Sequence, residues 1–164
     1  MSSNKYKLSP KVMAILEPLV EFELYQSSKY VQAANVANKL GFFLAEAYYI
    51  GESKDERKHA LIHYDYITGR GSDFQMPSIE EPSVEAKDLY ALVEVVLDME
   101  GEATDMYQKA CADVFGLCQM TYNHLLQFLT IQQEALKFNI DACAALDGLD
   151  KTGQQVVEGK IFKG

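Results

Sequence analysis

Side chains that can bind a metal recur in segments with helical periodicity. Glu56 and His59 lie three residues apart in the stretch ESKDERKHALIHYDY, residues 52–66. On a helix, residues i and i+3 share a face, so both side chains would point the same way. A single Glu-x-x-His pair is weak evidence for a metal site, because its meaning depends on what other segments place opposite it.

Glycines and prolines divide the chain into four long segments of helical periodicity and a short tail. Turns are expected at Gly41 and Gly116, and Ser83 is expected to cap the third helix. Pro18 is unfavourable inside the first segment, because an interior proline kinks or breaks a helix, and it could mark a later helix start. The predicted helices span about 10–40, 42–69, 83–114 and 117–146, followed by a tail helix at about 150–162.

These segments predict an all-α fold, a four-helix bundle of two antiparallel hairpins joined by a long crossover loop, plus a short C-terminal helix. Helices of about 28 residues are about 42 Å long. The link from Arg70 to Ser83 could extend roughly 45 Å, which is enough to run the length of such a bundle. We interpret residues 1–164 as one domain with a core bundle at about 10–147.

Polar residues on the four predicted helices lie at similar distances from the two predicted turns. In an antiparallel hairpin, residues equally far from the turn lie at the same height. Four residues lie 15 to 18 positions from Gly41 or Gly116, about 24 Å along the helix, namely Glu23, Glu56, Glu100 and Gln133. The first of them also belongs to a core-facing stripe formed by Leu16, Leu19, Glu23, Gln26, Tyr30, Ala33 and Ala37.

A metal site explains this polar layer better than four unrelated residues do. Taken singly, a glutamate is more often solvent-exposed, and a histidine such as His59 is more often a hydrogen-bonded core residue. Three carboxylates buried together without a counter-charge would cost several kcal/mol per ion, and a pair of divalent cations removes that conflict. Oxygen ligands with one imidazole suit iron, manganese or zinc.

Composition narrows the classes of partner. The formal charge of −9 disfavours nucleic acid and anionic membranes. The amino terminus has no apolar signal region, and no run of about eighteen apolar residues occurs. Three cysteines without a C-x-x-C pattern indicate a reducing compartment. We therefore expect a cytoplasmic protein with no membrane segment.

Several stretches, in order and at matching spacing, resemble the ferritin family, specifically non-haem ferritins with an H-type ferroxidase centre. The resemblance covers nearly the whole chain. The matching stretches are ELYQSSKY (23–30), ESKDERKHA (52–60), GRGSDFQMPSIEEP (69–82), DMEGEAT (98–104) and FLTIQQEAL (128–136).

The resemblance implies a role for each residue of the layer. It implies that the metal ligands are Glu23, Glu56, His59 and Glu100. Among these, Glu56 would bridge two irons. The uncharged Gln133 would lie near the second iron. Tyr30 would either donate a hydrogen bond or an electron beside the centre, or be an ordinary core tyrosine.

Two histidines fall outside this ligand set. His63 lies one turn beyond His59 and could extend the site, although packing or solvent contact near the edge of the bundle is the favoured interpretation. His124 is expected to lie too far along its helix to join the centre.

The activity implied by the resemblance is oxidation of Fe(II) by O2 or peroxide at a di-iron centre, with storage of ferric oxyhydroxide in a homo-oligomeric cage of 24 subunits. No haem is expected, because Arg57 follows the bridging glutamate where bacterioferritins have a haem-binding methionine. Two alternatives stay open. One is a di-iron oxidase or peroxide scavenger that stores nothing, and the other is a structural bundle whose polar layer sets helix register.

Overall fold

Six helices make up the regular structure in the computed structural model, which describes residues 3–163. Five are α-helices, and the first is a short 3₁₀ helix. Their bounds are η1 Ser3–Tyr6, α1 Pro10–Leu40, α2 Phe43–Gly69, α3 Leu89–Val114, α4 Gln119–Leu146 and α5 Lys151–Ile161.

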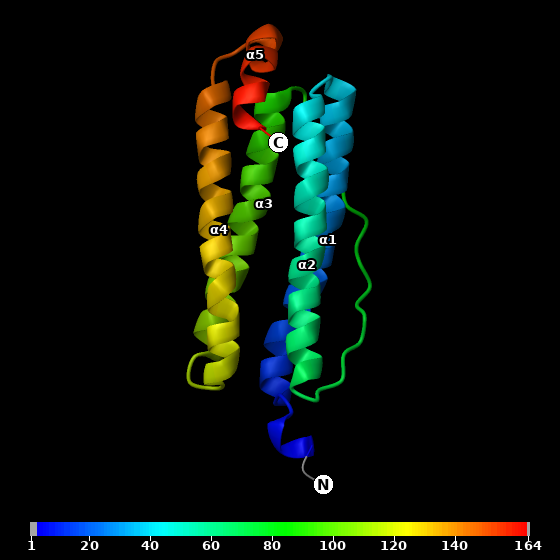
Figure 1. The fold of residues 1–164 in the computed structure, drawn as a ribbon, viewed down its shortest axis with the longest axis vertical. Helices are drawn as coiled ribbons and strands as arrows, with labels where there is room; N and C mark the ends of the chain where they lie inside the picture. The colour runs from blue at the N-terminus through cyan, green and yellow to red at the C-terminus, as the bar shows by residue number, and fades with distance from the viewer. Residues whose placement is uncertain (1–2, 164) are drawn as a thin grey trace.

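The four long helices run side by side as two hairpins, α1 with α2 and α3 with α4 (Figure 1). The segment 70–88 has no helix or strand and passes along the outside of the bundle from one end to the other. It therefore joins the two hairpins without crossing the interior. This arrangement is the predicted four-helix bundle with a crossover loop, and α5 is the predicted C-terminal helix.

The predicted turns at Gly41 and Gly116 are confirmed. Both glycines adopt the left-handed conformation, with φ of 88° and 81°, which side chains with a Cβ rarely tolerate. At the other end of α1, Ser9 caps the helix with its side chain and Pro10 occupies the first turn. The helix continues through Pro18, so a late start is wrong.

Helix α3 begins six residues later than the expected cap at Ser83. Its N-cap is Asp88, whose carboxylate accepts a hydrogen bond from the amide of Ala91 at 2.8 Å. Acidic caps of this kind satisfy an amide that has no partner within the helix. The crossover is correspondingly longer than predicted and extends to Asp88.

Helix α5 forms despite two glycines in its sequence, because its polar side chains are tied to the bundle. Asp150 caps its start through the amide of the third helical residue. Gln154 accepts from the Leu89 amide at 3.0 Å, and Glu158 accepts from two amides at the start of α2 at 2.8 and 3.0 Å. The short helix thus supplies caps for both α2 and α3, and these bonds compensate for weak helix propensity.

Two apolar clusters fill the interior on either side of a polar layer. One contains Tyr49, Met99 and Phe162 near α5, and the other contains Leu16 and Phe128 toward the opposite end. The predicted stripe on α1 is buried at every position. Among the described residues, no helix combines the length and apolar character needed to cross a membrane.

Candidate metal centre

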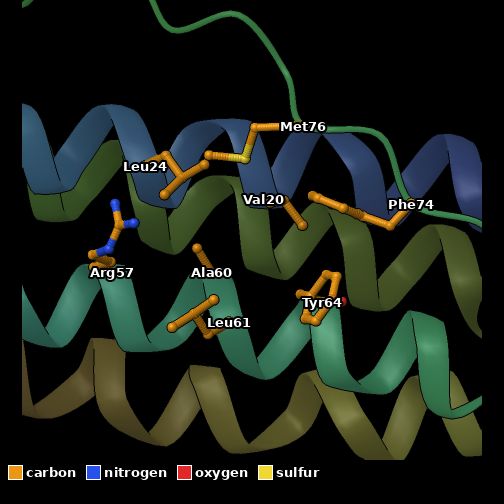
Figure 2. Close-up of a pocket in the computed structure, with 8 residues that line it drawn as sticks. All are labelled: Val20, Leu24, Arg57, Ala60, Leu61, Tyr64, Phe74 and Met76. Atoms are coloured by element: carbon orange, nitrogen blue, oxygen red, sulfur yellow. The ribbon is translucent and has the colours of Figure 1, made fainter.

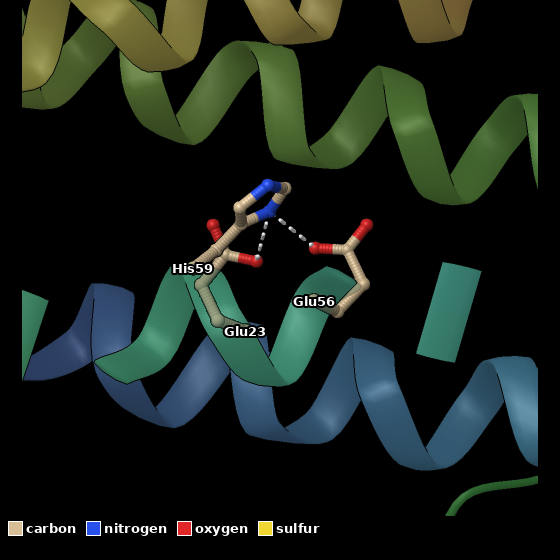
Figure 3. Close-up of side chains that lie close together, drawn as sticks. All are labelled: Glu23, Glu56 and His59. Atoms are coloured by element: carbon tan, nitrogen blue, oxygen red, sulfur yellow. Dashed lines mark hydrogen bonds and ion pairs between the residues drawn. The ribbon is translucent and has the colours of Figure 1, made fainter. Parts of the chain in front are cut away.

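A compact group of ligand atoms lies between the two apolar clusters. Glu23 from α1 meets Glu56 and His59 from α2, and one ligand atom from each lies within 4.8 Å of the others. His59 Nδ1 is 3.1 Å from Glu56 Oε2 and 3.7 Å from Glu23 Oε2 (Figure 3). The expected Glu-x-x-His pair therefore does face a carboxylate from a neighbouring helix.

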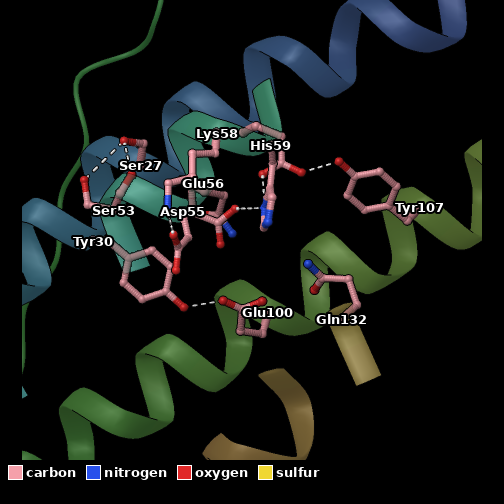
Figure 4. Close-up of polar contacts among 12 residues, drawn as sticks. Ser27, Tyr30, Ser53, Asp55, Glu56, Lys58, His59, Glu100, Tyr107 and Gln132 are labelled. Carbon is pink, nitrogen blue, oxygen red and sulfur yellow. Dashed lines mark hydrogen bonds and ion pairs between the residues drawn. The ribbon is translucent and has the colours of Figure 1, made fainter. Parts of the chain in front are cut away.

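The second hairpin adds Glu100 from α3, which is 1% exposed. Its Oε1 accepts a hydrogen bond from the hydroxyl of Tyr30 (Figure 4). The structure thus places Tyr30 as a donor to an expected ligand, which was one of the two interpretations of this residue. Three helices contribute carboxylates to one buried layer, as the sequence predicted.

Because the polar layer is buried, an unpaired negative charge on one of its carboxyl groups is energetically unfavourable. Desolvation, followed by neighbouring Glu23, raises the pKa of Glu56 to about 8, although its bond to His59 opposes this. Desolvation and nearby Glu56 raise the pKa of Glu100 to about 7. Burial alone would lower the pKa of His59, but its two carboxylate partners raise it to about 10.

These shifts describe a site that holds extra protons when it holds no metal. A divalent cation would replace those protons and neutralise the carboxylates. Carboxylate oxygens with one imidazole fit iron, manganese or zinc, so the donor set present fits the expected metal.

The amide of the layer belongs to Gln132, and the placement predicted for Gln133 is wrong by one residue. Gln133 is exposed, whereas Gln132 is 2% exposed. With its amide oriented to match donor to acceptor, Gln132 donates to Glu100 Oε2 at 3.0 Å and to the Glu100 carbonyl at 3.2 Å. The buried stripe of α4 could have shown this, because Gln132 follows Leu125 by seven positions and Phe128 by four.

Sequence reasoning also missed Tyr107, whose hydroxyl donates to Glu23 Oε1. A sequence signal existed, since Tyr107 follows Glu100 by seven positions, just as Tyr30 follows Glu23. His63 is fully buried and lies with Nε2 2.7 Å from the Tyr107 hydroxyl, so solvent contact at the edge of the bundle is wrong.

A mostly apolar groove beside α2 lies outside this layer. It lies between α1, α2 and the crossover, has a volume of about 230 Å³, and is flanked by Arg57 (Figure 2). None of the predicted site residues lines it. Its lining residues are Val20, Leu24, Arg57, Ala60, Leu61, Tyr64, Phe74 and Met76.

Known proteins share both sequence and fold with this chain. Bacterial non-heme ferritins of two Staphylococcus epidermidis strains are each 27% identical over 100 residues. Those matches cover 61% of this chain and 60% of the relatives, so the chain spans about three fifths of the length of the curated proteins.

Solved structures agree over almost the entire fold. An open-pore ferritin from the hyperthermophilic archaeon Archaeoglobus fulgidus has a TM-score of 0.90 at 21% identity, covering 96% of this chain and 99% of that one. A humanized archaeal ferritin has a TM-score of 0.90 at 20% identity with the same coverage. The ferritin-like domain model matches residues 13–144, and the chain therefore belongs to the ferritin-like domain family.

Proposed function

We propose that the protein oxidises Fe(II) with O2 at two adjacent metal positions in the polar layer and stores the ferric product inside a cage of 24 copies. The observation that carries the proposal is the convergence of Glu23, Glu56 and His59 to within 4.8 Å, with Glu100 buried on the facing helix. Iron is the substrate and the stored cargo.

The first iron would bind Glu23 Oε2, Glu56 and His59, because one ligand atom from each lies within 4.8 Å of the others. The second would bind Glu100 and share Glu56. Two Fe(II) ions held side by side can each give one electron to the same O2, which with two protons becomes hydrogen peroxide. The protein supplies proximity and charge, and Tyr30 orients Glu100 by donating to one of its oxygens.

The bond from Gln132 favours a weaker second position. An uncharged amide beside Glu100 adds no negative charge, so the ferric product would be held less tightly there than by another carboxylate. This suits a site that turns over and passes iron to a store. The non-heme character and the cage are proposed for this chain from the names of its relatives and the family fold.

The experiment replaces both Glu56 and His59 with Ala. Fast O2 consumption on addition of Fe(II) should be lost while the helical far-ultraviolet signal persists. Unchanged oxidation kinetics in that variant would overturn the site assignment. Light scattering on the wild type tests the cage, since 24 chains of 18.4 kDa give about 440 kDa, and a dimer would favour an oxidase that stores nothing.

A further inference from the structure

A chain of hydrogen bonds leads from the candidate metal centre into the apolar cluster beyond it. The Tyr107 hydroxyl donates to Glu23 Oε1, and His63 Nε2 lies 2.7 Å from that hydroxyl. His63 Nδ1 in turn lies 2.9 Å from Nε2 of His124. His124 is the partly exposed end, where its Nδ1 is 3.4 Å from the amide nitrogen of Gln127.

Proton counting fixes the direction of every bond in this chain. A carboxylate only accepts, so the single proton of Tyr107 goes to Glu23 Oε1. The Tyr107 oxygen can then only accept from His63, which must carry its proton on Nε2. Burial and neighbouring His124 lower the pKa of His63 to about 3, so its other nitrogen is free to accept from His124.

The packing around the chain holds its rings in place. Phe128 stacks on Tyr107 with ring centroids 4.9 Å apart, and on His63 at 4.4 Å. Tyr66 stacks on His124 at 4.1 Å. Imidazoles and a phenol in an apolar cluster are costly unless their polar atoms are paired, and here each ring that leads to Glu23 is hydrogen-bonded and stacks on a neighbouring aromatic ring.

Glu23 shows what this arrangement accomplishes. Tyr107 occupies Oε1, which leaves Oε2 as the oxygen nearest His59 and the space beside Glu56. The arrangement has a counterpart, since Tyr30 on α1 donates to Glu100 on α3 while Tyr107 on α3 donates to Glu23 on α1. Within residues 3–163, only the Tyr107 side continues into histidines, through His63 to His124.

We propose that Tyr107 and His63 are positioning residues for the first metal: His63 donates to the Tyr107 oxygen, which directs the phenol proton onto Glu23 Oε1 and leaves Glu23 Oε2 to bind the ion. This inference rests on the proposed function, because it assumes that Glu23 is a ligand. Partners that orient metal ligands in this way typically change metal affinity by about 10-fold to 100-fold when removed.

Titration with Co(II) alone, followed by its visible absorption, tests the proposal without relying on iron oxidation. Tyr107→Phe should weaken the tighter binding step by about 10-fold or more and alter the absorption bands, because Glu23 is no longer fixed. The matched control is Tyr49→Phe, which removes the hydroxyl of another fully buried tyrosine, one without a hydrogen-bond partner in the described part of the chain. Its Co(II) binding should equal that of the wild type.

His63 is tested by a pair of substitutions that separates donation from filling space. His63→Gln keeps an N–H donor and should retain more Co(II) affinity than His63→Leu, which has none. A melting curve of each variant accompanies the titration. If the Leu variant fails to fold, the comparison of Tyr107→Phe with Tyr49→Phe decides alone.

The outcomes separate this inference from the proposed function. Equal Co(II) affinity and equal spectra in Tyr107→Phe and Tyr49→Phe would overturn the positioning role while leaving the metal centre intact. A wild type that binds no Co(II), or binds it unchanged after Glu56 and His59 are replaced by Ala, would overturn the metal centre and this inference together.

Discussion

The two hairpins supply different halves of the candidate metal centre. The α1–α2 hairpin provides two carboxylates and an imidazole whose ligand atoms already lie within 4.8 Å. The α3–α4 hairpin provides one carboxylate, Glu100, with hydrogen-bond donors from Tyr30 and Gln132 at its two oxygens. A cation placed among the first group meets converged ligands, whereas one beside Glu100 meets a single carboxylate and an uncharged amide that adds no negative charge. We infer that the first position binds more tightly than the second.

Replacing one carboxylate from each half should give the largest and most unequal effects. Glu23→Ala should weaken the tighter step of Zn(II) binding by more than the roughly 10-fold to 100-fold typical of losing a partner that only orients a ligand, because it removes a converged ligand itself. Glu100→Ala should leave that step nearly unchanged and abolish the weaker one. Isothermal titration calorimetry distinguishes the two steps.

Glu134→Ala is the matched control, since Glu134 is an exposed carboxylate on α4. Its two binding steps should match those of the wild type. Equal losses of both steps in Glu23→Ala and Glu100→Ala would show that the halves are not distinct.

The next largest effect is the dependence of Zn(II) affinity on pH, because protons compete with the metal for the carboxylates. With folded pKa values of about 8 for Glu56 and about 7 for Glu100, Zn(II) affinity should fall as the pH is lowered from 8 to 6.5. The metal-free protein should respond in the opposite direction. A carboxyl whose folded pKa is raised stabilises the fold at low pH, and that contribution is lost as pH rises through the folded pKa.

The melting temperature without metal should therefore fall between pH 6.5 and 8, and His59, with its pKa raised to about 10, contributes in the same sense. Below pH 6.5, the lowered pKa values of His63 and His124 act the other way, so that range is excluded. Glu100→Gln should flatten the pH dependence of melting. A melting temperature that rises across this window in the wild type would contradict the raised carboxyl pKa values.

Local pattern was sufficient for the bundle and for most of the site. The stripe on α1 and the turn glycines depend on periodicity and backbone conformation, which a single segment reveals. The start of α3 was misplaced because Ser83 and Asp88 are both good N-cap residues. Which of them caps the helix depends on tertiary packing, since Leu89, the residue after Asp88, is fully buried.

The misplaced glutamine has a similar cause. Gln133 was chosen by its distance from Gly116, and the leucines four residues before and three residues after it, Leu129 and Leu136, are only partly buried. The rotation of α4 is set by packing against the other helices, and one residue of error turns a helix by about 100°. The seven-residue spacing from Glu100 could have pointed to Tyr107, but its bonds to Glu23 and His63 join side chains from three different helices, and the pattern of a single helix does not show such pairing.

The next expected effect is smaller and concerns the two adjacent glutamines on α4, one of which contacts Glu100. Gln132→Leu removes the donor to Glu100 Oε2 and should cost about 1 kcal/mol of unfolding free energy in the metal-free protein. Gln133→Leu, at an exposed position, should change it by less than about 0.5 kcal/mol. Urea unfolding measures both, and a larger cost at Gln133 would restore the prediction made from sequence.

The smallest expected effect separates hydrogen bonding from burial at two tyrosines of the α1–α2 hairpin, of which one donates to Glu100 on α3. Tyr30 and Tyr49 are both fully buried with ring centroids 6.0 Å apart, but only the Tyr30 hydroxyl has a partner, Glu100. Tyr30→Phe should weaken the second Zn(II) step several-fold, because Glu100 loses its orienting donor. Tyr49→Phe should leave both steps unchanged and should not lower the urea midpoint, since it removes a buried hydroxyl that lacks a partner among the described residues. If Tyr30→Phe matched Tyr49→Phe in both measurements, the Tyr30 bond would be irrelevant to the second position, and Tyr30 would be an ordinary core tyrosine.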